Sequence, residues 1–125
     1  QVLLGRFSIL PLLVGDATPG EVAEVLERVW GGPETRIVIS SDLSHYLEYS
    51  QARAVDERTA EEVLALRSPI SPDQACGAGA INGLLVAALD RGLTASLLDL
   101  RSSGDTAGDR SQVVGYGAFA FVETV

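Results

Sequence analysis

The chain has 125 residues and a mass of 13.1 kDa, which fits a single domain on the usual ~100–200 residues per domain. Hydrophobic residues make up 46% and charged residues 21%, so the composition excludes an intrinsically disordered chain. The net charge of −8 argues against a nucleic-acid partner, because phosphate backbones bind basic surfaces. No apolar run approaches the ~18 residues of a membrane span, so we also expect no membrane partner.

The cysteine and methionine content indicates the cellular compartment of the protein and whether the sequence includes its start. A single cysteine, Cys76, cannot form an intramolecular disulfide, which favours a reducing compartment and a cytoplasmic location. All basic residues are arginine and alanine is frequent, a composition typical of a GC-rich bacterial source. The chain contains no methionine and begins at Gln1, so we expect further residues upstream.

The first part of the chain predicts a strand, a helix and a second strand. Residues 7–14 (FSILPLLV) form an apolar run typical of a buried strand, although Pro11 favours a strand end or a bulge. Thr18 then provides an N-cap, and the apolar stripe of the following helix ends before Gly31. Residues 36–40 (RIVIS) are β-branched and uninterrupted, as expected for a strand covered on both faces.

The rest of the chain predicts two helices followed by two strands. Residues 56–66 and 77–91 carry apolar side chains at helical spacing. Residues 94–100 and 113–122 read as strands, and their connection is too short for a helical crossover, so we expect an antiparallel pair. The order β-α-β-α-α-β-β predicts an α/β fold, layered α/β/α, with a mostly parallel central sheet.

Asp42 and His45 follow the predicted strand at residues 36–40. Ligands of open α/β sheets bind at the carboxyl ends of strands, so we expect a site here, and Tyr46 lies close enough in sequence to line it. On a helical turn, Asp42 and His45 would project to one side and could share a metal or a proton. The spacing alone is equally compatible with a helix cap at Asp42 and a packed His45.

Cys76 opens the second strong helix together with two glycines. A thiol at a helix N-terminus lies at the positive end of the helix dipole, which favours thiolate. Gly77 and Gly79 leave backbone N–H groups free to meet an anion or an oxyanion. The alternative is a small cysteine that fills a buried corner beside the helix start.

An acidic loop at residues 101–110 carries Asp105 and Asp109. Its spacing matches no EF-hand pattern, and aspartates in turns usually accept hydrogen bonds from their own backbone. We therefore favour a structural role for both carboxylates over a Ca²⁺ or Mg²⁺ site.

Two chemistries use an aspartate, a histidine and a cysteine that converge on one point. As metal ligands, Asp42, His45 and Cys76 would suit iron, copper or zinc rather than magnesium. As a catalytic set, Cys76 would attack, His45 would act as base and Asp42 would orient the imidazole. The residues alone do not separate these two possibilities.

Three sequence blocks, taken in order, resemble the Memo family, named after a mediator of ErbB2-driven cell motility. The blocks are SSDLSHY at residues 40–46, CGAGAINGLLVAA at residues 76–88 and SSGDTAGDRSQVVGYGAFAF at residues 102–121. The opening run FSILPLLVG is also similar to this family, so the resemblance spans essentially the whole chain. The family is also known as the B component of the AmmeMemoRadiSam system.

The resemblance implies a fold similar to the LigB-type class III extradiol dioxygenases and a site for a redox-active metal, iron or copper. By motif, Asp42 and His45 correspond to the D-x-x-H residues of the family site and Cys76 to its cysteine. The other metal-binding residues of the family are two histidines in its amino-terminal half, which this chain lacks. Residues 1–125 therefore resemble the carboxyl-terminal portion of one Memo-like domain.

The resemblance also implies partners and leaves alternative functions open. We expect the chain to associate with the amino-terminal half of the domain or with a second copy of itself, and with a radical-SAM protein and an AMMECR1-like protein. One alternative is a non-catalytic module that binds phosphate or phosphotyrosine peptides at Gly77 and Gly79. Another is a hydrolase or transferase that uses Cys76, His45 and Asp42. Enzymatic turnover is open; if present, we expect metal-dependent oxidoreductase chemistry.

Overall fold

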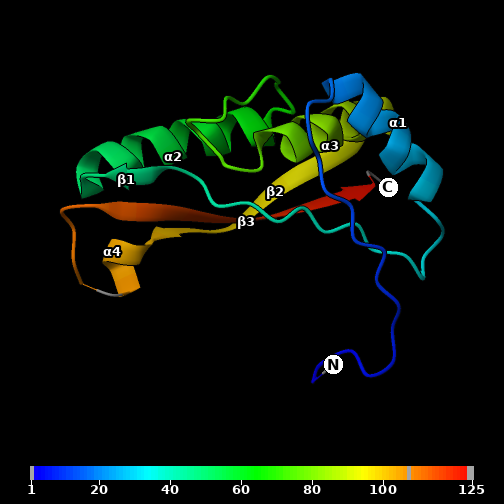
Figure 1. Cartoon of the computed structure of the whole chain (residues 1–125), viewed down its shortest axis with the longest axis horizontal. Helices are drawn as coiled ribbons and strands as arrows, with labels where there is room; N and C mark the ends of the chain where they lie inside the picture. Colours follow the sequence, from blue (N-terminus) through cyan, green and yellow to red (C-terminus); the bar gives the residue numbers. More distant parts are fainter. Residues whose placement is uncertain (1, 107, 124–125) are drawn as a thin grey trace.

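The computed structural model describes residues 2–106 and 108–123 (Figure 1). Its helices and strands, in chain order, are α1 (Pro19–Val29), β1 (His45–Leu47), α2 (Tyr49–Leu64), α3 (Ala78–Asp90), β2 (Leu93–Ser102), α4 (Ser103–Thr106) and β3 (Val113–Glu123). Among the described residues, no helix is both long enough and apolar enough to cross a membrane.

The strands form one antiparallel sheet in the order β1-β3-β2. The long hairpin of β2 and β3 pairs from Leu93 opposite Glu123 to Ser102 opposite Gly115. This hairpin confirms the antiparallel pairing that the short connection predicted. The short strand β1 pairs with the other side of β3, and the register shifts between His45 and Leu47.

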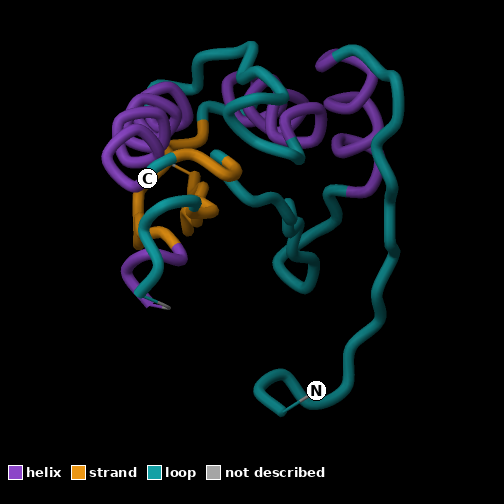
Figure 2. Tube along the Cα trace, turned by 60° about the vertical axis from the view of Figure 1, so that its left-hand side comes forward, coloured by secondary structure: helices purple, strands orange, loops and turns teal. Residues whose placement is uncertain are grey.

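Helices α1, α2 and α3 lie on one side of this sheet (Figure 1). Figure 1 shows α2 and α3 running above the strands, with α1 beside α3 at the far end from α4. The turned view in Figure 2 shows the same separation of helices and strands and shows residues 2–17 leading away from both. The result is two layers of secondary structure rather than the three that the sequence predicted.

The hydrophobic core forms where α2 and α3 meet the sheet and the loop that enters the site. Its buried members come from that loop, both helices and the connection between them: Leu43, Val63, Ile70, Ala75, Ala78 and Leu85. Phe119 and Phe121 of β3 pack against this cluster from the sheet. The core therefore lies directly beneath the segment that carries Asp42 and His45.

The structure confirms the α/β class, but its sheet is antiparallel where the sequence predicted a mostly parallel one. Residues 7–14 and 36–40, which were expected to supply the parallel strands, belong to no strand. A strand is stable only when a neighbour satisfies its backbone hydrogen bonds, and neither segment has such a neighbour among the described residues. Their apolar side chains are largely exposed as a result: Leu13 is 100% and Val38 is 84% exposed.

Three elements show how local chemistry sets the helix limits. Thr18 and Glu21 form the predicted capping box, in which Thr18 N–H donates to the Glu21 carboxylate at 2.8 Å. Helix α3 lies within the predicted range of 77–91. Helix α2 begins seven residues before the predicted start at residue 56, because the Glu48 side chain accepts the Ser50 N–H and caps a polar first turn.

Candidate metal centre

The site begins with a reciprocal contact between Asp42 and Cys76, which are 34 residues apart in the chain. The Asp42 N–H donates to Cys76 Sγ at 3.3 Å, and the Cys76 N–H donates to the Asp42 carbonyl at 3.3 Å. The Ser41 hydroxyl lies 3.7 Å from the same sulfur. These contacts from the backbone and from Ser41 fix the position of the Cys76 sulfur beside Asp42.

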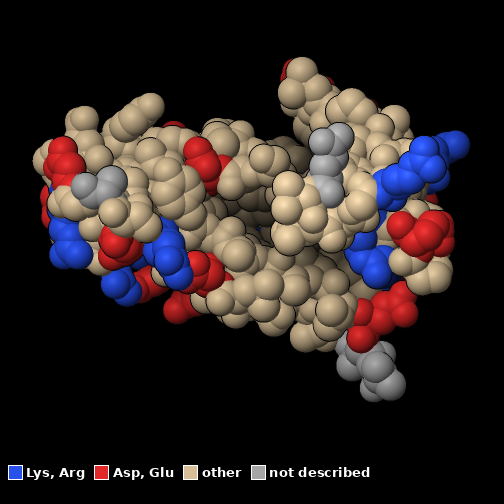
Figure 3. Space-filling model, turned by 90° about the horizontal axis from the view of Figure 1, so that it is seen from below, with Lys and Arg blue, Asp and Glu red and all other residues tan. Residues whose placement is uncertain are grey.

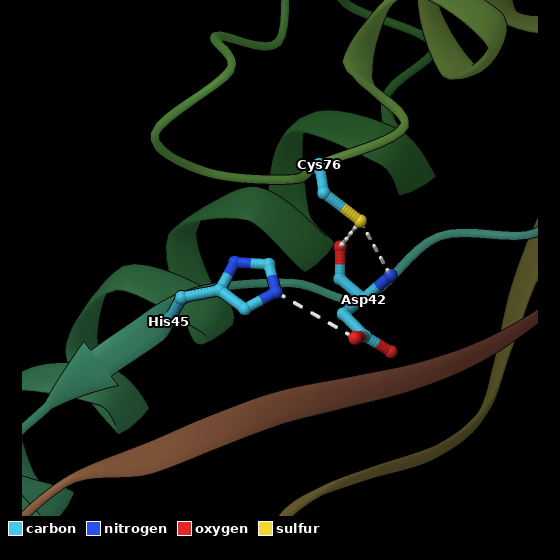
Figure 4. Close-up of side chains that lie close together, drawn as sticks. All are labelled: Asp42, His45 and Cys76. Carbon is cyan, nitrogen blue, oxygen red and sulfur yellow. Dashed lines mark hydrogen bonds and ion pairs between the residues drawn. The ribbon is translucent and has the colours of Figure 1, made fainter.

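His45 completes a cluster of three different donor groups (Figure 4). Its Nε2 lies 3.5 Å from Asp42 Oδ2, and the imidazole is 31% exposed. One ligand atom from each of Asp42, His45 and Cys76 lies within 4.8 Å of the other two. The structure therefore brings together the three side chains that the sequence singled out, at the edge of the sheet and next to the start of α3.

Tyr46 follows His45 in a backbone conformation that is rare for a tyrosine. Its φ is 58°, in the left-handed region, and it falls at the register shift between β1 and β3. A bulge of this kind changes the direction of neighbouring side chains in a strand. The Tyr46 ring is exposed, with its centroid 5.8 Å from that of His45. Tyr46 is therefore an exposed aromatic neighbour of His45.

Gly77 and Gly79 lie at the start of α3, but neighbouring side chains occupy the space beside them. The Gly77 N–H donates to the Ser41 hydroxyl at 2.8 Å, and a Cβ on Gly77 would lie 2.7 Å from the Ser41 Cβ. A Cβ on Gly79 would lie 3.2 Å from Val14 Cγ1. Gly77 thus allows the Ser41 segment to approach Cys76, and the proposed phosphate site at these glycines stays a prediction.

Asp56, which the sequence analysis did not single out, supports the site from below. Its carboxylate is buried and accepts the Ser44 N–H at 2.9 Å, one residue before His45. Burial raises the pKa of the Asp56 carboxyl above its ordinary value, and the Ser44 N–H and the His45 charge oppose that rise. The Ser44 hydroxyl is buried nearby without hydrogen-bond geometry to any described group. Asp56 therefore anchors the backbone between Asp42 and His45.

The acidic loop has structural partners, in line with the role favoured from the sequence. Asp105 accepts the Tyr49 hydroxyl at 2.7 Å and the Ser102 N–H at 2.8 Å, and both hydrogen bonds lower the pKa of Asp105. Asp109 accepts the N–H and hydroxyl of Ser111, which lower its pKa in the same way. These carboxylates stabilise the turn between β2 and β3, away from the cluster.

The arrangement fits a metal better than it fits a nucleophile with its base. A carboxylate, an imidazole and a thiolate whose ligand atoms lie within 4.8 Å of one another can meet at one ion. A Cys-His pair would instead require a hydrogen bond from thiol to imidazole, and none joins Cys76 to His45 in the part of the chain that the structure describes. The hydrolase alternative stays a prediction.

The class of protein that these observations define is a small α/β domain with an aspartate, a histidine and a cysteine gathered at one edge of its sheet. A family model described as Memo-like protein matches residues 1–120. The chain therefore belongs to the Memo family, as its three sequence blocks indicated.

Curated relatives agree with this assignment. A MEMO1 family protein of Nitrosopumilus maritimus is 34% identical, over 94% of this chain and 46% of the relative. MEMO1 family proteins of Methanosarcina acetivorans and Archaeoglobus fulgidus are each 35% identical, over 94% and 97% of this chain and 49% and 51% of the relatives. These relatives are archaeal, and the chain spans about half the length of each.

Proposed function

We propose that this chain supplies part of a metal site for iron or copper, with Asp42, His45 and Cys76 as ligands. The convergence of the three donor atoms within 4.8 Å is the observation that carries the proposal. Family membership supports the proposal as well, since the resemblance to the Memo family implies the same three residues. A bound iron or copper ion would supply redox chemistry that these side chains do not provide alone.

The side chains around the cluster have distinct supporting roles in this proposal. The Asp42 N–H holds the Cys76 sulfur in place, and Ser41 links that sulfur to the start of α3. Asp56 fixes the backbone between Asp42 and His45 through Ser44. The exposed ring of Tyr46 beside His45 would shape the approach to the cluster. We therefore propose that this Memo-like protein carries an oxidoreductase-type site.

The complete site and its setting are part of the same proposal. Because the chain spans about half the length of its curated relatives, we propose that the remaining ligands and the parallel, LigB-like part of the domain come from the other half. Association with a radical-SAM protein and an AMMECR1-like protein, in the cytoplasm, is proposed from family membership. Co-purification of a tagged chain with proteins of these two kinds tests the association.

Metal loading tests the ligand assignment. The chain is incubated with Fe(II) under anaerobic conditions or with copper, and bound metal is measured by mass spectrometry. A thiolate-to-metal absorption band would report Cys76 unambiguously, because the chain has one cysteine and one histidine. We expect Cys76→Ser to abolish that band and His45→Ala to weaken binding by at least ~10-fold.

A matched control distinguishes binding by these three ligands from nonspecific binding of metal ions to the acidic surface of the chain. Asp90 is an exposed carboxylate at the far end of α3 without a hydrogen bond or ion pair to any described residue, so Asp90→Asn should leave metal loading unchanged. Iron and copper at background levels in the parent chain would contradict the proposal. So would loading that is the same in the parent, Cys76→Ser and His45→Ala chains.

A further inference from the structure

A pocket of about 490 Å³ lies beside the cluster and includes His45 in its wall. This volume falls in the ~300–1,000 Å³ range of small-molecule sites. Strand β1 contributes Leu47 next to His45, helix α2 contributes Val55 and Arg58, and the turn before Cys76 contributes Asp73. One wall is therefore apolar, and the pocket reaches from the metal-binding imidazole to a guanidinium.

Arg58 differs from most other arginines of this acidic chain in having no partner. Arg28, Arg53, Arg91 and Arg101 each form an ion pair with a carboxylate at 2.6–2.8 Å. In residues 2–106 and 108–123, neither a hydrogen bond nor an ion pair engages the Arg58 guanidinium. A planar guanidinium with its donors free and its position in a pocket wall is suited to bidentate binding of a carboxylate.

We propose that this pocket binds a small organic monocarboxylate, with its carboxylate on Arg58 and its other end at His45. Leu47 and Val55 provide an apolar surface for the carbon skeleton between the two ends. Asp73 in the same wall repels a dianion such as a phosphate ester more strongly than it repels a monocarboxylate, because the repulsion grows with the charge of the ligand. One guanidinium offsets the single charge of a monocarboxylate but only part of the charge of a dianion. The part of this inference that rests on the proposed function is that the end of the ligand remote from Arg58 would lie beside a metal ion at His45.

Binding of benzoate to the metal-free chain tests the inference. Benzoate is a rigid monocarboxylate that fits the volume, and binding is followed by NMR on the resonances of His45, the single histidine. We expect saturable shifts of the His45 ring with benzoate. Phenyl phosphate should bind more weakly, and benzyl alcohol, which lacks the charge, should produce no saturable shift.

Two arginine variants on the same helix separate pocket binding from net charge. Arg58→Gln should weaken benzoate binding by at least ~10-fold, as the loss of a charged bidentate contact implies. Arg53→Gln removes the same charge from an arginine that pairs with Glu57 outside the pocket, so it should bind benzoate like the parent chain. Asp73→Asn should bring phenyl phosphate closer to benzoate in affinity.

The outcomes distinguish this inference from the metal assignment. Absence of saturable benzoate binding, or equal affinity in the parent and Arg58→Gln chains, would overturn the pocket inference. Arg58 is exposed, so the variant should keep the parent's amide spectrum, and Arg58→Lys gives a second test because it keeps charge without the planar fork. Benzoate binding by a chain that takes up no iron or copper would overturn the metal proposal alone.

Discussion

Gly115 makes room for the carboxylate that holds the site backbone in place. A Cβ on Gly115 would lie 1.9 Å from Asp56 Oδ2, a distance that no real contact allows. The Gly115 carbonyl accepts the Leu43 N–H, and its own N–H donates to the Ser44 carbonyl, each at 2.8 Å. Gly115, Ser44 and Asp56 thus form one packed unit beneath Asp42 and His45.

Gly115→Ala should therefore destabilise the protein by about 1–3 kcal/mol, the usual cost of forcing an extra carbon into a packed interior. Chemical denaturation measures the change in the free energy of unfolding. Gly20→Ala is the matched control, because a Cβ there meets nothing within 4 Å. It should stay within about 1 kcal/mol of the parent. Equal effects of the two substitutions would show that Asp56 does not occupy the space beside Gly115.

Asp105 makes the stability of the folded protein depend on pH in the acidic range, and the direction of that dependence follows from its hydrogen bonds. Hydrogen bonds from Tyr49 and Ser102 lower its folded pKa below the ordinary 3.8, so the folded state binds the proton less readily than the unfolded state. The ionised Asp105 carboxylate therefore stabilises the folded state fully at pH values above the ordinary pKa. This stabilisation is lost as the pH falls through the lowered pKa of the folded state. Asp105→Asn should therefore melt below the parent at neutral pH.

The difference in melting temperature between the parent and Asp105→Asn should shrink as the pH falls from 7 towards 2. Thermal melts across that range measure it. Tyr49→Phe should show part of the same effect, since it removes the hydroxyl that donates to Asp105 at 2.7 Å. Asp73→Asn, which loses no described hydrogen bond, should follow the parent profile. A constant difference across the pH range would contradict this assignment.

The site residues show what sequence spacing can and cannot predict. Asp42 and His45 were singled out because they follow the apolar run at residues 36–40, although that run forms no strand, and Cys76 was singled out because it precedes helix α3. Asp56 was missed because a carboxylate inside a polar helix normally faces solvent. The signal that could have found it was Gly115, a glycine in an apolar strand, which marks a close approach of a neighbour.

At the scale of elements, α1 and α3 pack through a glycine. A Cβ on Gly83 would lie 2.2 Å from Val22 Cγ1 and 3.3 Å from the Ala23 backbone nitrogen, so the helices touch closely at that point. The Arg91 guanidinium supports the same contact, because it pairs with Glu27 and stacks 4.1 Å from the Trp30 ring centroid. The α1–α3 interface therefore depends on a small residue in α3.

Gly83→Ala should loosen this interface and lower the free energy of unfolding by about 1–3 kcal/mol, although alanine favours a helix more than glycine does. Relative to the parent, the variant should show a larger increase in the rate of amide hydrogen exchange in α1 than in β2 and β3. Gly20→Ala again serves as control, here because it lies in α1 but outside the contact. A Gly83→Ala protein that is more stable than the parent would mean that propensity outweighs the close approach.

The elements also show where prediction from sequence fails. Helices α1 and α3 and the β2–β3 hairpin were predicted because their patterns and caps are local. The strands expected at residues 7–14 and 36–40 depend on neighbours that local sequence does not specify. The start of α2 was missed for a different reason: its first turns carry polar side chains that give no apolar period.

At the scale of the whole molecule, apolar side chains are exposed along the segments that form no strand. Ile9 is 74%, Leu10 is 66% and Leu13 is 100% exposed. Figure 3 shows a hollowed face whose middle carries neither acidic nor basic groups, with charges gathered towards both ends. Exposed apolar surface of this kind favours association, and strand β2 adds an open sheet edge.

We therefore expect the 125-residue chain alone to self-associate, and sedimentation velocity across a range of concentrations measures this. A variant with Ile9, Leu10 and Leu13 changed to glutamine should associate less at an unchanged melting temperature, because exposed side chains bury little area in the monomer.

The matched control changes three exposed apolar residues on the helices, Val25, Leu64 and Leu89, to glutamine. It removes a similar number of apolar side chains but leaves residues 7–14 intact, so it should associate like the parent. If the parent sediments as a monomer at every concentration, residues 7–14 do not form an association surface. The apolar run would then owe its composition to something other than a covering partner.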